Sequence, residues 1–167
     1  TRGYIVREIS DDLIQDALQV RGVLEGLAAK TLAEKGITEE QKKTLSHCIE
    51  QTEKLFEGKT EFGDEELESY HHWNVIFHDT VIQGAGNIAL TQALAKNNQL
   101  PMASAQALTY DQSRALSEYR RLHYAHLQHC SIYDALVQRQ AGRAESLMRE
   151  HSAVVMLGET VKHILST

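Results

Sequence analysis

Apolar residues recur at every third or fourth position over most of the chain, a spacing that is typical of amphipathic helices. The first such stripe predicts a helix that runs to Lys35, with Ser10 as its N-cap and Gly36 as its C-cap. The residues of this stripe are Leu13, Ala17, Val20, Leu24, Leu27 and Thr31. The pattern therefore predicts a long amphipathic helix near the start of the chain.

Capping residues and glycines divide the next part of the chain into helices. Thr38 and Gln41 form a capping-box pattern, which predicts a second helix ending near Gly58. A third helix is predicted from about 63 to 83, where the sequence GAGN interrupts the apolar pattern. Asn87 is the expected N-cap of a short fourth helix that ends before the single proline.

The last third of the chain continues the helical pattern. The expected helices are a fifth over about 103–122, a sixth over about 124–138 after a bend, and a last one from the turn at Gly142 to about Ile164. With one proline and abundant Ala, Leu, Glu and Gln, the composition favours an all-α protein of about six to seven helices. We expect residues 10–167 to form this single bundle.

Residues 1–9 depart from the helical pattern. The segment GYIV is short and rich in residues that favour strands. A chain that opens in a strand and without an initiator methionine is expected to be a fragment whose partner strand lies upstream. The first nine residues are therefore interpreted as a remnant of a preceding unit.

Charge and composition exclude some classes of function. The formal net charge is −6, whereas a nucleic-acid-binding surface is expected to be basic. No apolar run approaches the roughly 20 residues that a membrane span needs. Cys48 and Cys130 show no metal or redox spacing and are interpreted as reduced structural thiols of a cytoplasmic protein.

Histidine is the unusual residue of this chain, with nine copies. Asn74 and His78 are one helical turn apart, so their Cβ atoms are expected about 5–6 Å from each other. They flank the buried arc that contains Trp73 and Phe77, so both should face the interior near the edge of the core. Two side chains in this relation can share a metal ion.

Two further helices also direct a histidine inward. His129 is spaced at helical intervals from Leu122 and Ile132, and His151 from Leu147 and Val154. Burying an imidazole without a partner is costly. Two interpretations remain open on periodicity alone: one shared metal site, or three core histidines that are hydrogen-bonded separately.

The other histidines carry weaker signals. His71 precedes Asn74 by three positions and can line the same cavity. His47, His123 and His163 are expected to be solvated, and the roles of His72 and His126 are open.

Three segments carry a resemblance to a known family. They are VRGVLEGLAAKTLAE, with Arg21, Leu24, Glu25, Ala28 and Ala29, then NVIFHDTVIQGAGN, and then HCSIYDALVQRQAGRAESLMREH, in which His151 follows His129 by 22 positions. In this order and at these separations, they resemble the C-terminal ligand-binding domain (FCD domain) of the FadR subfamily of GntR transcription regulators. The resemblance covers nearly the whole chain.

This resemblance implies an antiparallel helical bundle that encloses a divalent metal ion. The family's metal ligands, one carboxylate and three histidines, correspond to Asn74, His78, His129 and His151. Asn74 departs from the aspartate of many members, and its neutral amide should bind metal more weakly and favour an anionic ligand. Imidazole and oxygen ligands suit Zn, Ni, Mn or Fe.

The resemblance also implies a metabolite-sensing role and a homodimer. The ligand would be a small anionic metabolite, a carboxylate, with Arg21, Asn87 and His71 as candidate contacts. Arg21 has an alternative interpretation as an ion-pair partner of Glu25, and Asn87 as a helix cap. Operator DNA would be bound by an N-terminal winged-helix domain absent from this chain, and residues 1–9 look like the end of its wing.

Two other functions compete with this interpretation. The adjacent His78 and Asp79 resemble the His-Asp pair of metal-dependent phosphohydrolases, but Asp79 is rotated about 100° further from the buried arc. No nucleophile–base constellation is present, so we expect no catalytic residues and no enzyme. A purely structural dimerisation bundle would leave the three inward histidines unexplained.

Overall fold

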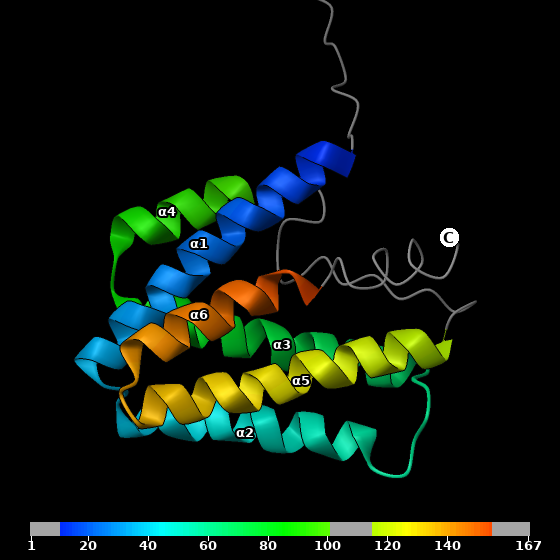
Figure 1. The fold of residues 1–167 in the computed structure, drawn as a ribbon. Coiled ribbons are helices and arrows are strands. Elements are labelled where there is room, and N and C mark those ends of the chain that lie inside the picture. Colours follow the sequence, from blue (N-terminus) through cyan, green and yellow to red (C-terminus); the bar gives the residue numbers. More distant parts are fainter. Residues whose placement is uncertain (1–10, 101–114, 155–167) are drawn as a thin grey trace, which may run out of the picture.

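The computed structural model describes residues 11–100 and 115–154, which form six helices and no strand (Figure 1). The helices are α1 (Asp11–Lys35), α2 (Glu39–Phe56), α3 (Asp64–Ala85), α4 (Ile88–Asn97), α5 (Ala115–Val137) and α6 (Ala141–Ser152). The prediction of an all-α bundle is confirmed. The strand expected at residues 1–9 lies outside the described residues, as do residues 103–114 and the end of the last predicted helix.

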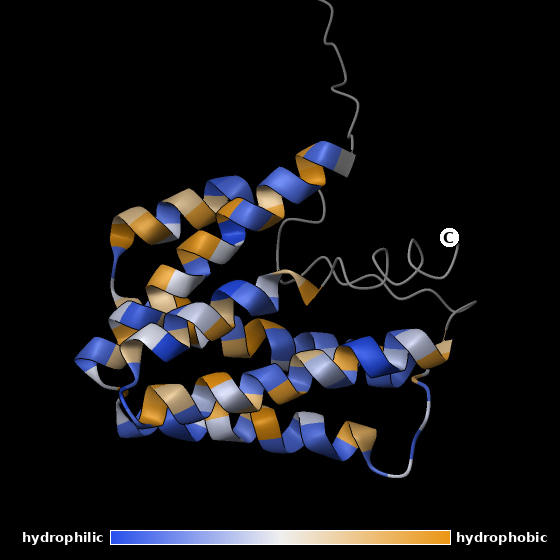
Figure 2. Ribbon diagram, viewed as in Figure 1, coloured by the Kyte–Doolittle hydropathy of each residue, from blue (hydrophilic) through white to orange (hydrophobic). Residues whose placement is uncertain are grey.

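The helices pack in two groups that share α3. Helix α1 packs mainly on α6 and α3, whereas α2 packs on α3 and α5. Figure 1 shows α5 running antiparallel to both α2 and α6, so neighbouring helices of the bundle mostly alternate in direction. Figure 2 shows apolar and polar stretches alternating along each helix, as expected when one side of every helix is buried.

Several helix ends follow the predicted capping residues. The backbone N–H of Gln41 donates to Oγ1 of Thr38 at 3.1 Å, which completes the predicted capping box of α2. Gly86 ends α3 in the left-handed conformation with φ of 63°, which favours glycine. Asn87 then caps α4, because its Oδ1 accepts from the backbone N–H of Leu90 at 3.1 Å.

Two predicted boundaries near the end of the chain were wrong. Helix α5 is continuous from Ala115 to Val137, because the stretch between 122 and 124 contains no glycine or proline to interrupt it. The turn before α6 is made by Arg139, with φ of 56°, and Gly142 lies inside the helix. The Arg139 guanidinium donates to the backbone oxygen of Glu34 at 2.5 Å, which helps to hold this turn against the end of α1.

The apolar stripe of α1 only partly coincides with its buried face. Val20 and Leu27 are 47% and 40% exposed, although the sequence places them on that stripe. The buried face instead carries the ion pair of Arg21 and Glu25 and a row of small residues. The small residues are Gly22, Gly26, Ala28 and Ala29.

Gly26 allows α1 and α6 to approach closely. A Cβ atom at this position would meet Cγ of Arg149 at 2.5 Å and the backbone oxygen of Glu145 at 3.1 Å. We expect Gly26→Val to lower the free energy of unfolding by about 1–3 kcal/mol, because the added carbons overpack this contact. Gly142→Ala in α6 is the matched control, since its Cβ would meet nothing within 4 Å. Urea unfolding that ranks the two variants equally would contradict the account.

Candidate metal centre

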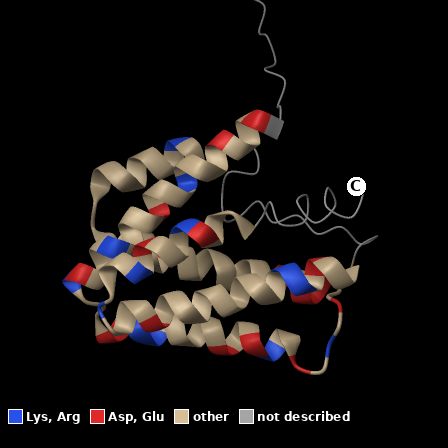
Figure 3. Ribbon diagram, in the orientation of Figure 1, with Lys and Arg blue, Asp and Glu red and all other residues tan. Residues whose placement is uncertain are grey.

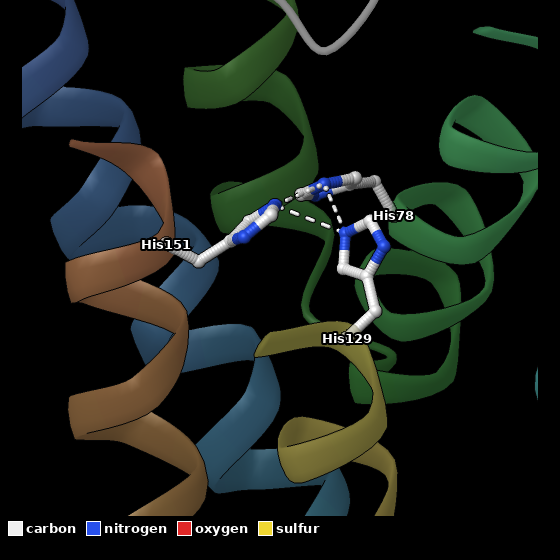
Figure 4. A group of neighbouring side chains, drawn as sticks. All are labelled: His78, His129 and His151. Carbon is white, nitrogen blue, oxygen red and sulfur yellow. Dashed lines mark hydrogen bonds between the residues drawn. The ribbon is translucent and has the colours of Figure 1, made fainter. Parts of the chain in front are cut away.

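Three histidine rings meet inside the bundle. His78 comes from α3, His129 from α5 and His151 from α6, and each is at most 6% exposed. The Nε2 atoms are 3.2 Å apart for His78 and His151, 3.3 Å for His129 and His78, and 3.0 Å for His129 and His151. Figure 4 shows these nitrogens pointing toward one another. The sequence prediction that all three histidines face inward is confirmed.

The three nitrogens cannot satisfy one another by hydrogen bonding. A neutral imidazole carries one N–H, so each Nε2 presents either a proton or a lone pair. With three mutually adjacent atoms and two possible states, at least one pair must set a proton against a proton or a lone pair against a lone pair. A cation at the centre removes this conflict, because it accepts all three lone pairs.

The spacing of the nitrogens also fits a metal ion. Nitrogens that lie about 2.0–2.1 Å from a zinc-like ion are about 3.4 Å apart in tetrahedral geometry, and about 2.9 Å apart at right angles. The separations of 3.0–3.3 Å between the three Nε2 atoms fall between these values. Among the described residues, His78, His129 and His151 are the group of three or more potential ligands that lies close enough to hold an ion.

Burial favours the neutral form of these rings. The pKa values of His129 and His151 lie well below the usual histidine value, first because burial disfavours the charged form and then because other nearby cations repel a proton. Both rings are therefore neutral near pH 7 and can bind a cation without first losing a proton.

Polar side chains lie behind two of the rings. Nδ1 of His151 donates to Oε1 of Gln128 at 3.1 Å. Nδ1 of His78 lies 3.1 Å from Oε2 of Glu25, an ion-pair distance with an angle outside hydrogen-bond geometry. Burial raises the pKa of the Glu25 carboxyl, but the charges of His78 and Arg21 outweigh this effect and hold it well below its usual range. Metal-binding histidines commonly have a carboxylate or a carbonyl oxygen at their second nitrogen, and Glu25 and Gln128 supply oxygens of these two kinds.

Sequence reasoning did not assign these partners to the site. Glu25 belongs to the first recognised segment, but it was considered only as the ion-pair partner of Arg21. Gln128 immediately precedes His129, so its side chain lies about 100° around the α5 axis from that histidine. The spacing of residues along α5 therefore gives no sign that Gln128 contacts His151 on α6. The one available signal was the presence of two polar residues on otherwise buried helix faces.

Arg21 makes the ion pair that was its alternative interpretation. Its Nε donates to Oε1 of Glu25 at 2.9 Å, and the residue is 3% exposed. Its two terminal nitrogens make no hydrogen bond or ion pair with the residues that the structure describes. The ion pair is confirmed, and contact with a ligand stays a prediction.

The other predicted site residues lie in different settings. Asn74 is buried one turn before His78, and its role as a fourth ligand stays a prediction. His71 is half-buried on the same helix. Asn87 uses its side-chain oxygen to cap α4, so its alternative interpretation as a cap is confirmed.

Among the remaining histidines, His47 and His72 are exposed, whereas His123 is half-buried, with its ring centre 4.8 Å from that of Phe56. The expectation that His123 is solvated was therefore wrong. His126 is fully buried, with its Nε2 2.6 Å from Oε2 of Glu53. His163 lies outside the described residues.

The hydrolase alternative loses its geometric basis. Asp79 is exposed, and it is not part of the group of potential ligands around His78. Burial of part of its side chain raises its pKa, although His78 opposes this effect. The structure thus brings together three histidines and does not bring Asp79 to them.

Comparison with known proteins identifies the family. The family model of the FCD domain matches residues 16–153, most of the chain and all six helices in part or whole. A comparison with curated proteins found no match. In the described residues, none of the helices is both long and apolar enough to cross a membrane. Figure 3 shows acidic and basic residues interspersed along the helices. The chain therefore belongs to the FCD family, the C-terminal ligand-sensing domain of GntR-type (FadR-like) transcription regulators.

Proposed function

We propose that this domain senses a small carboxylate through a divalent metal ion held by His78, His129 and His151, with Asn74 as the fourth ligand. The observation that carries the proposal is the buried convergence of three Nε2 atoms at 3.0–3.3 Å. A bound ion would supply Lewis-acid coordination positions for an anion. Imidazole together with an amide oxygen suits Zn, Ni, Mn or Fe.

The charges around the site favour an anionic ligand. The rings of His129 and His151 and the amide of Asn74 are neutral, and the negative charge of Glu25 is balanced by Arg21 at 2.9 Å. A divalent ion would therefore leave about two positive charges in a buried site, where uncompensated charge is costly. The terminal nitrogens of Arg21 offer a guanidinium edge, the group best suited to bind a carboxylate with two hydrogen bonds.

The metabolite would act on DNA binding through the rest of the regulator. In this proposal, a winged-helix domain precedes α1, the full protein is a homodimer in the cytoplasm, and the domain has no enzymatic activity. Helix α1 contributes Arg21 and Glu25 to the site and lies nearest in sequence to that DNA-binding domain. A ligand can shift the arrangement of the helices only by binding one arrangement more tightly than another.

Asn74→Asp tests the fourth ligand. We expect tighter metal binding, because a carboxylate charge replaces an amide dipole, and weaker carboxylate binding, because the site loses about one positive charge. Calorimetric titration with Ni²⁺, and then with a panel of mono-, di- and hydroxycarboxylates, measures both affinities. Unchanged values for both would show that Asn74 does not contact the ion.

Arg21→Met tests the anion contact and with it the sensing function. We expect the metal-loaded variant to bind its best carboxylate at least about tenfold more weakly, which corresponds to the loss of a charge-assisted hydrogen bond worth roughly 1.5–3 kcal/mol. The metal should still bind, since Arg21 is not a ligand. If no carboxylate binds metal-loaded wild-type protein, the sensing proposal is wrong.

A further inference from the structure

The sides of the His78 and His151 rings that face away from the centre are both occupied by oxygen atoms. Oε2 of Glu25 lies 3.1 Å from Nδ1 of His78, and Oε1 of Gln128 accepts from Nδ1 of His151 at 3.1 Å. All four side chains are at most 6% exposed, so bulk water does not compete for these contacts. Oε2 of Glu25 and Nδ1 of His78 have no hydrogen-bond partner among the residues that the structure describes.

We propose that Glu25 and Gln128 are positioning residues that fix His78 and His151 in the tautomer whose Nε2 lone pair points to the metal. This inference rests on the proposed metal site and assigns its supporting residues. Because a neutral imidazole has one N–H, an oxygen acceptor at Nδ1 draws the proton there and leaves Nε2 free to ligate.

Helix α1 sets the position of Glu25. Arg21, one turn earlier, donates to Oε1 at 2.9 Å and leaves Oε2 at 3.1 Å from Nδ1 of His78. The close approach of α1 and α6 at Gly26 keeps α1 beside the helix that carries His151. Arg21, Glu25 and His78 thus form a buried chain of contacts that leads from α1 to the metal centre.

The two partners should differ in strength. The ionised carboxylate of Glu25 is a stronger proton acceptor than the neutral amide oxygen of Gln128. His129 differs from His78 and His151, because none of the side chains that the structure describes forms a hydrogen bond with its Nδ1. Loss of either partner is expected to weaken metal binding by about 10–100-fold, the usual effect of removing an outer contact of a ligand histidine.

The test reads the tautomers directly in the metal-free protein. Long-range ¹H–¹⁵N spectra of ¹⁵N-histidine-labelled protein should show Nδ1–H forms for His78 and His151. Gln128→Leu should convert His151 to a mixture of its two tautomers and leave the tautomer of His78 unchanged. Glu25→Gln should change the tautomer of His78 alone. Competition with a chelator should then show the 10–100-fold loss of Zn²⁺ affinity in both variants. Gln83→Leu, at an exposed position of α3, is the control and should change neither measurement.

The outcomes separate this inference from the proposed function. Wild-type protein that binds Zn²⁺, together with variants that keep the wild-type tautomers and affinity, would overturn the inference and leave the metal site intact. Failure of wild-type protein to bind any divalent metal would overturn the proposed function, and the metal-free spectra would still decide whether Glu25 and Gln128 set the tautomers. Gln128→Leu keeps the test decisive if Glu25→Gln, which leaves Arg21 without its ion pair, fails to fold.

Discussion

His151→Ala is expected to weaken binding of Zn²⁺ or Ni²⁺ by more than about 100-fold. The reason is that a direct ligand is lost, whereas loss of an outer contact alone costs about 10–100-fold. The substitution should fold, because His151 lies in the last turn of α6, and alanine favours a helix. Equilibrium dialysis followed by elemental analysis measures the bound metal.

Thermal unfolding provides a second readout of the same change. At a free metal concentration of 100 times Kd, wild-type protein should gain about 2.7 kcal/mol of stability, which raises the unfolding midpoint by roughly 5–10 °C. The variant should show no such rise. His47→Ala, at an exposed position of α2, is the matched control and should respond like wild type. Equal metal binding by His151→Ala and His47→Ala would show that His151 is not a metal ligand.

The isolated domain is expected not to bind operator DNA, whereas the full-length regulator should bind it with a Kd of roughly 10⁻⁸ M or lower. The chain carries a formal net charge of −6, and its described helices form an effector domain. Operator recognition by a two-fold dimer needs two reading heads at fixed separation, which this domain would set through α1. Fluorescence anisotropy with the regulator's own promoter measures both proteins.

The metal site should couple this DNA binding to the metabolite. Addition of the best-binding carboxylate should change the operator affinity of the metal-loaded full-length protein by about 5–150-fold, the usual range of allosteric coupling. Full-length protein with His151→Ala should still bind DNA but lose this response. A promoter shift by the isolated domain equal to that of the full-length protein would refute the assignment of roles to the two domains.

Local sequence signals predicted most of the fold. The capping box at Thr38, the glycine end of α3 and the cap at Asn87 all depend on residues within a few positions of one another, and all three are confirmed. The turn at Arg139 was missed because its support comes from Glu34, which is 105 positions away. The buried face of α1 was missed for a related reason, since small residues there serve contact with α6 and carry no apolar periodicity.

The candidate site divides in the same way. Helical periodicity was enough to predict that the three histidines face inward, because His129 and His151 lie on the apolar stripes of their helices and His78 flanks the buried arc of α3. That the three Nε2 atoms meet within 3.3 Å depends on how three helices pack, which no single stripe encodes. The roles of Glu25 and Gln128 were not predicted, because each residue contacts a histidine on another helix.

The most direct test of the metal centre is a crystal structure of protein loaded with Zn²⁺, with anomalous diffraction recorded on both sides of the zinc absorption edge. We expect one zinc peak per chain, about 2.0–2.1 Å from Nε2 of His78, His129 and His151. An anomalous peak elsewhere, or none at this position at saturating Zn²⁺, would contradict this expectation.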